Sequence, residues 1–75
     1  MEFEKLQEII AGVLKMEPER IKPEMRFVED LGADSLEIFQ IIIEIEEAFG
    51  VVIGDAVIST VKTVEDAAKI MKNLG

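Results

Sequence analysis

The sequence contains no cysteine, histidine, tryptophan or tyrosine. Without cysteine, the chain has neither a disulfide bond nor a thiolate metal site. Without histidine, it lacks the commonest general base and the commonest transition-metal ligand, so it cannot build a Ser-His or Cys-His hydrolytic site. Carboxylates and lysines are present, but their spacing does not indicate a positioned acid–base pair. We therefore predict that the protein is not an enzyme and holds no metal ion.

Long apolar runs are also missing. The longest uncharged, largely apolar stretch covers the seven residues 48–54, whereas a membrane-spanning helix needs about 20. The N-terminal segment MEFEKLQEII is acidic and amphipathic, unlike a signal or transit peptide. A chain of 75 residues buries only roughly 60% of its unfolded surface. We expect one small soluble domain over residues 1–75, a cytoplasmic monomer that inserts into no membrane and serves as a binding or carrier module.

Basic residues are absent from the middle of the chain. Residues 27–61 carry eight acids and no Lys or Arg, while the other 40 residues carry eight charges of each sign. The whole net charge of −8 therefore lies in this acidic segment. A solvated helix face with acidic caps is one explanation, but such faces usually mix both signs. We favour a functional cause, the attraction of basic protein partners, and we expect no nucleic-acid partner, because phosphate binding depends on Lys and Arg.

Apolar residues at helical spacing predict four helices, at about 2–15, 35–49, 55–60 and 64–74. Pro18 ends the first pattern, and residues 16–33 form a long loop of a kind that is often functional. The 55–60 segment has the β-branched content of a strand, but a lone strand has no pairing partner in this chain. We therefore predict an all-α domain, a small four-helix bundle with a short third helix and a long loop between the first two helices.

The second predicted helix has the clearest start signal. Asp34 can cap it, and Glu37 lies three residues further on, as in a capping box. Gly50 is placed to end the helix in the left-handed conformation. Thr63 and Asp66 resemble another capping box before the last helix. In the long loop, we expect four apolar side chains to anchor the backbone to the core: Ile21, Phe27, Val28 and Leu31.

The same helix has two different faces. At about 100° per residue, a broad apolar arc forms the expected core face, made of Ile38, Ile41, Ile42, Ile45, Ala48 and Phe49. A narrow polar strip contains Glu37, Gln40, Glu44 and Glu47. Leu36 and Ile43 line one edge of this strip, either as an extension of the core face or as apolar contacts for a partner.

The stretch FVEDLGADSLE, residues 27–37, carries the functional signal. Ser35 stands at the first turn of the second helix, where we expect it to be exposed. A serine there is usually only a helix-start residue, but Asp34 already fills the capping role. The helix N-terminus offers free backbone amides and a partial positive charge, a favourable seat for a phosphate ester. The polar strip begins one turn away and offers a docking surface to an enzyme that acts on Ser35.

With these features, the sequence resembles the acyl carrier proteins of bacterial type II fatty acid synthesis. The likeness covers essentially the whole chain, with LGADSLE at residues 31–37 as its core and with flanking matches at residues 27–30, 46–47 and 49. The resemblance implies that a dedicated synthase transfers 4′-phosphopantetheine from coenzyme A to the hydroxyl of Ser35. It also implies that Asp34 helps to hold the synthase's Mg²⁺. The thiol of this arm would carry acyl groups as thioesters between enzymes of fatty acid biosynthesis.

The resemblance further implies a set of partners. These are the holo-carrier-protein synthase, acyltransferases, ketosynthases and other fatty acid synthesis enzymes with basic docking patches. The residues implied to face them are Leu36, Glu37, Gln40, Ile43, Glu44 and Glu47. Two features depart from the family pattern: Gln40 stands where an acid is common, and residues 56–60 of the third helix carry no acid. They leave open a carrier for a specialised pathway, with polyketide or amino-acyl cargo.

Two other kinds of function compete with the carrier. An acidic helical interaction module without a prosthetic group explains the charge equally well, but it leaves LGADSLE unexplained. A calcium buffer fits poorly, because the acids at positions 29, 30, 34 and 37 lack the spacing of the twelve-residue calcium loop.

Overall fold

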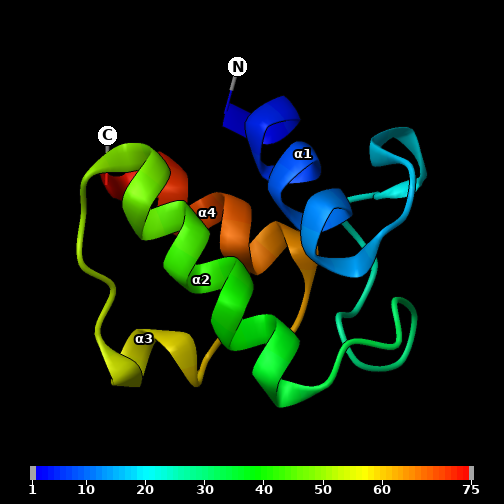
Figure 1. Cartoon of the computed structure of the whole chain (residues 1–75). Coiled ribbons are helices and arrows are strands. Elements are labelled where there is room, and N and C mark those ends of the chain that lie inside the picture. Colours follow the sequence, from blue (N-terminus) through cyan, green and yellow to red (C-terminus); the bar gives the residue numbers. More distant parts are fainter. Residues whose placement is uncertain (1, 75) are drawn as a thin grey trace.

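The computed structural model describes residues 2–74, and the regular elements of this range are all helical (Figure 1). They are α1 (Glu2–Leu14), the 3₁₀ turn η1 (Pro18–Arg20), α2 (Ser35–Phe49), α3 (Asp55–Ile58) and α4 (Val64–Leu74). The all-α prediction is confirmed, and each helix boundary lies within two residues of the expected one. Over the range that the structure describes, no helix combines the length and the apolar character needed to cross a membrane.

The third helix is shorter than expected because two side-chain hydroxyls form hydrogen bonds with the backbone of its last turn. The hydroxyl of Ser59 donates to the carbonyl of Ala56 at 2.8 Å, and the hydroxyl of Thr60 donates to the carbonyl of Val57 at 2.6 Å. Such side-chain bonds to the backbone compete with continuation of the helix. The helix therefore stops at Ile58 and leaves residues 59–60 in a turn.

The core is formed by apolar side chains from α1, α2, α4 and the loops between them. The largest fully buried side chains are Phe27, Leu6, Ile10, Ile21, Ile41, Ile42, Ile45 and Val64. The predicted core arc of α2 is thus confirmed at its centre. It is wrong at its end, where Ala48 and Phe49 are exposed. The last turn of α2 extends beyond the buried core.

The long first loop is held against the start of α4. The N–H of Phe27 donates to the carbonyl of Lys62 at 3.0 Å, and the N–H of Val64 donates to the carbonyl of Met25 at 2.9 Å. Ile21 and Phe27 are buried and Leu31 is half-buried, as predicted for loop anchors. The prediction of a fourth anchor is wrong, because Val28 is 58% exposed. The turn that buries Phe27 directs the next side chain toward solvent.

Candidate functional site

Ser35 is the first residue of α2 and is exposed. Asp34 is its N-cap and has an extended backbone. The Asp34 carboxylate accepts a hydrogen bond from the N–H of Glu37 at 2.8 Å, and the Glu37 carboxylate accepts one from the N–H of Asp34 at 3.0 Å. This is the predicted capping box, with both reciprocal bonds formed. Asp34 and Glu37 therefore both help to fix the residue at which the helix begins.

The backbone before Ser35 is anchored on the core. Ala33 is buried, and its N–H donates to the carbonyl of Phe27 at 2.8 Å. Gly32 has a φ of +70°, in the left-handed region that glycine adopts without strain. Its N–H donates to the carbonyl of Val28 at 3.2 Å. The chain thus turns sharply onto the helix axis, and Ser35 is held at a fixed position on the surface.

The first turn of α2 leaves donors for an anion beside Ser35. The N–H of Glu37 is occupied by the Asp34 carboxylate, and the N–H of Ile38 donates to the Asp34 carbonyl at 3.0 Å. The N–H groups of Ser35 and Leu36 belong to the helix start, where an α-helix supplies no acceptor of its own. Together with the partial positive charge of the helix end, they suit a phosphate ester on the Ser35 hydroxyl.

The helix also brings the predicted partner-facing residues together. Leu36 is 74% exposed and Ile43 is 38% exposed, so both are available for contact and neither extends the buried core. Gln40 and Glu47 are exposed as well, while Glu44 is half-buried. Glu37 is half-buried and is committed to the capping box. The polar strip is therefore present as predicted, but its first acid also stabilises the helix.

Three exposed apolar residues, in α2, the following loop and α3, were not predicted. Phe39 is 49% exposed. It lies three residues after Leu36 and four before Ile43, and this spacing places all three on one helix face. That spacing was the signal that could have revealed it. Val52 and Val57, in the loop after α2 and in α3, are also exposed. Nothing in their local sequence distinguishes them from core residues.

The start of the acidic segment is partly neutralised by Arg26, which precedes it directly. The Arg26 guanidinium lies 3.3 Å from the Asp30 carboxylate and 3.5 Å from that of Glu29. The backbone N–H of Arg26 also donates to Asp30 at 2.8 Å, and this bond, with the side-chain bond, lowers the pKa of Asp30. Among the side chains of residues 3–73, no ion pair neutralises the acids of α2, and no three acids gather closely enough to hold a metal ion.

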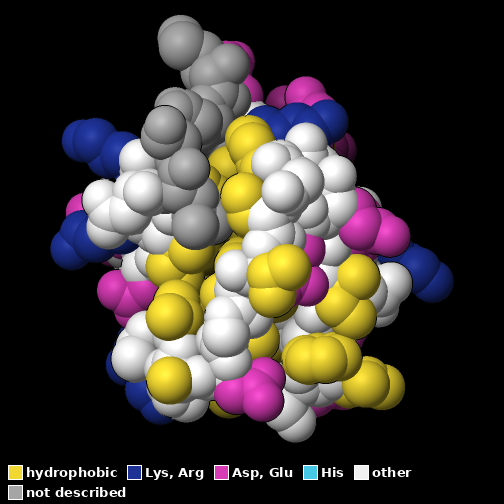
Figure 2. All heavy atoms as spheres, turned by 90° about the vertical axis from the view of Figure 1, so that its left-hand side faces the viewer, with side chains coloured by type: hydrophobic (Ala, Val, Ile, Leu, Met, Phe, Trp, Pro, Cys, Tyr) yellow, Lys and Arg dark blue, Asp and Glu magenta, His cyan; other side chains and the backbone are white. Residues whose placement is uncertain are grey.

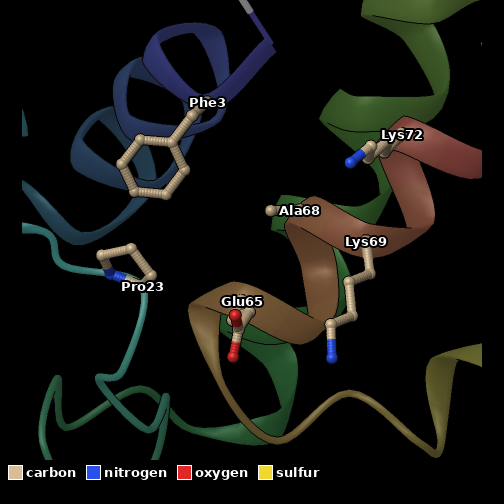
Figure 3. Close-up of a pocket in the computed structure, with 6 residues that line it drawn as sticks. All are labelled: Phe3, Pro23, Glu65, Ala68, Lys69 and Lys72. Atoms are coloured by element: carbon tan, nitrogen blue, oxygen red, sulfur yellow. The ribbon is translucent and has the colours of Figure 1, made fainter.

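A groove of about 310 Å³ lies between α1, the long loop and α4 (Figure 3). It is lined by Phe3, Pro23, Glu65, Ala68, Lys69 and Lys72. In Figure 3 the rings of Phe3 and Pro23 lie on one side and the side chains from α4 on the other. The groove shares no residue with the site around Ser35, so it is not a continuation of that site.

Comparisons with known proteins address the whole chain. The family model described as the phosphopantetheine attachment site matches residues 4–71. A protein of Thermosynechococcus vestitus named acyl carrier protein is 43% identical over 71 residues, covering 95% of this chain and 88% of its own. One of the same name from Sulfurovum is 36% identical over 72 residues and is covered to 96%, as is this chain.

A solved structure shows the same fold. It comes from Mycobacterium tuberculosis, and its description assigns it to the acyl carrier proteins. The two chains superpose with a TM-score of 0.95 at 29% sequence identity, and each is covered completely. Members of this family are carriers, not enzymes, and hold 4′-phosphopantetheine covalently. The matched family model, the relatives and the shared fold together show that this chain belongs to the acyl carrier proteins.

Proposed function

We propose that Ser35 is the residue that carries the 4′-phosphopantetheine arm. The observation that supports this most directly is the position of its exposed hydroxyl at the start of α2, next to backbone amides that suit a phosphate ester. The chain has one other serine, Ser59, whose hydroxyl already donates to the carbonyl of Ala56. When bound, the arm supplies a thiol that the cysteine-free chain lacks, and this thiol holds cargo as a thioester.

Around Ser35, each neighbouring residue has a separate task in this proposal. Asp34 orients the first turn of the helix and supplies a carboxylate for the Mg²⁺ of the synthase that attaches the arm. Glu44, Glu47 and the polar Gln40 face basic patches on partner enzymes. Leu36 and Ile43 supply apolar contacts beside those charges. The partners in this proposal are the cytoplasmic synthase, acyltransferases and ketosynthases that act on carrier-bound acyl groups.

The cargo proposed is the growing acyl chain of fatty acid biosynthesis. The names of the relatives agree with an acyl cargo. A specialised pathway is the second candidate, because Gln40 and the acid-free residues 56–60 make the docking side of the molecule less negative than the family pattern. Intact mass spectrometry of the protein purified from its own cells distinguishes the two candidates, because the mass reports both the arm and its cargo.

The attachment site is tested by incubating the protein with coenzyme A, Mg²⁺ and a broad-specificity phosphopantetheinyl transferase. We expect the wild type and Ser59→Ala to gain the mass of one arm and Ser35→Ala to gain none. Ser35→Ala should keep its fold within about 1 kcal/mol, because Asp34 retains the cap. Uptake of the arm by Ser35→Ala would show that the site assignment is wrong.

A further inference from the structure

The groove between α1, the long loop and α4 has an apolar floor and a cationic edge (Figure 3). Phe3 and Pro23 supply rings from two separate segments, and the single methyl group of Ala68 leaves the space of about 310 Å³ open. In the view of Figure 3, Ala68 lies between these rings and the two lysines, Lys69 and Lys72. A volume at the lower end of the range for ligand pockets suits one bulky apolar side chain.

Hydrogen bonds join the three walls of the groove. The side-chain amide of Gln7 in α1 donates to the carbonyl of Ile21 at 2.9 Å, and the N–H of Glu65 in α4 donates to the carbonyl of Pro23 at 2.9 Å. The loop is thus bonded to α1 on one side and to α4 on the other. Because the walls are fixed before binding, filling the groove costs little ordering entropy.

The charges at this groove differ from those of the acidic segment. Residues 27–61 hold the whole net charge and contain no base, and none of the groove's residues comes from them. In Figure 2, which faces α3 and the loop before it, hydrophobic and acidic side chains fill the centre, and Lys and Arg lie toward the edges. The groove instead has two lysines and one acid. The two surfaces therefore select partners of opposite local charge.

Both lysines of the groove are available to a partner. They are exposed, and among the side chains of residues 3–73 neither lies within ion-pair distance of a carboxylate. The acid of the groove, Glu65, lies two turns before Lys72, which is about 10 Å along the axis of α4. A partner's carboxylates therefore favour the end of the groove that holds Lys69 and Lys72.

We propose that this groove is a second docking site, for a segment of another protein in which a bulky apolar side chain, such as Phe or Leu, is followed by acids. The apolar side chain lies against the two rings and Ala68, and the acids lie against Lys69 and Lys72. An apolar centre with a charged rim is the usual anatomy of a specific interface. The proposal goes beyond the carrier role and needs no arm. Because the groove shares no residue with α2, binding here leaves Ser35 to other proteins.

Charge decides between this occupant and two others. A second copy of the chain brings a net charge of −8 against an equal charge, which opposes association. An anionic lipid surface is repelled for the same reason. Another protein needs only a short acidic segment, whatever its net charge, so it meets the lysines without this repulsion.

The test uses short peptides with blocked ends as probes. The matching probe is acetyl-Phe-Asp-Asp-amide. Two relatives change one property each: acetyl-Ala-Asp-Asp-amide lacks the ring, and acetyl-Phe-Lys-Lys-amide has the opposite charge. Each is titrated into the isotope-labelled full chain at low and high salt, and the NMR shifts of the backbone amides locate the binding and give its dissociation constant.

Three variants identify the contacts. Ala68→Leu fills the groove and keeps its charges, whereas Lys69→Gln/Lys72→Gln removes the positive charges and leaves the groove open. The control, Lys5→Gln/Lys15→Gln, changes two exposed lysines outside the groove and alters the net charge equally. Thermal melts check that each variant folds. The pair on the surface of α4 keeps the test decisive if Ala68→Leu does not fold.

We expect the matching probe to shift the amides of residues 65–72 and to bind about ten-fold more tightly there than either relative. Ala68→Leu should weaken it about ten-fold. Lys69→Gln/Lys72→Gln should weaken it about five-fold at low salt, the effect of two exposed ion pairs, and less at high salt. The control variant should bind like the wild type.

Equal binding of the three probes at α4, or unchanged binding of the matching probe to both groove variants, would overturn the docking site. Self-association or binding to phosphatidylglycerol vesicles that Lys69→Gln/Lys72→Gln abolishes would overturn the choice of occupant. A chain that binds the matching probe at α4 but takes up no arm would support this site and contradict only the proposed carrier function.

Discussion

Replacing Asp34 separates the two tasks assigned to its carboxylate. Asp34→Ala removes the acceptor for the N–H of Glu37, a bond of 2.8 Å, and leaves in place only the bond from the backbone N–H of residue 34 to the Glu37 carboxylate. Loss of an N-cap costs about 1 kcal/mol, and in a domain of this size that lowers the melting temperature by about 4–8 °C. Asp34→Asn keeps an oxygen at the same place and should lose only a few tenths of a kcal/mol of charge–dipole stabilisation, roughly the lower limit for a helix end.

Attachment of the arm should respond in a different order. Asn lacks the negative charge that we propose for holding Mg²⁺, so both variants should load about ten-fold more slowly or worse than the wild type. Circular dichroism melts and time courses of arm attachment, followed by intact mass, measure the two effects on the same samples. Melting temperatures that fall equally for Asn and Ala would refute the capping argument. Loading of Asp34→Asn at the wild-type rate would refute the role in Mg²⁺ binding.

Two further predictions concern charge. Glu47→Lys should slow transfer between partner enzymes at low salt and have little effect at high salt, because long-range attraction acts on association and is screened. Glu4→Lys, the same change at an exposed residue of α1, is its control. Glu37→Lys is unsuitable, since it also breaks the capping box. Asp66 has a pKa lowered by hydrogen bonds from the N–H groups of Lys62 and Thr63, so its stabilisation is complete above about pH 4, its unfolded value, and is lost as the pH falls below it. Melts of Asp66→Asn should show a weaker acid dependence than the wild type; equal curves would contradict this assignment.

The sequence predicted what local chemistry determines. The limits of α2 follow from Asp34, Glu37 and Gly50, each of which acts within a few residues of its own position, and the structure contains both the capping box and the left-handed cap. The box of Thr63 and Asp66 was predicted for the same reason and is also formed. That the candidate attachment serine stands at the start of α2 follows from these local signals.

Features that depend on distant parts of the chain were not predicted. Val28 and Phe49 look like core residues in the sequence, and only the packing of the whole molecule shows that they face solvent. The bond between the Glu46 carboxylate and the N–H of Ile53 joins residues that no repeating pattern connects. The long loop is attached to the start of α4 through backbone groups. Nearly every residue type supplies these groups, so the side chains in the sequence give no indication of this attachment.

That attachment bears on how the protein meets proteases. Residues 21–34 have no helix, and exposed segments of this kind are usually the first to be cleaved. Here the backbone of Met25 and Phe27 is bonded to residues 62–64, and the ring of Phe27 is buried. A protease can accommodate the backbone around Phe27 only after those bonds open and the ring leaves the core. Cleavage there should therefore follow the population of molecules in which this part of the core is open, and its rate becomes a gauge of the stability of this region.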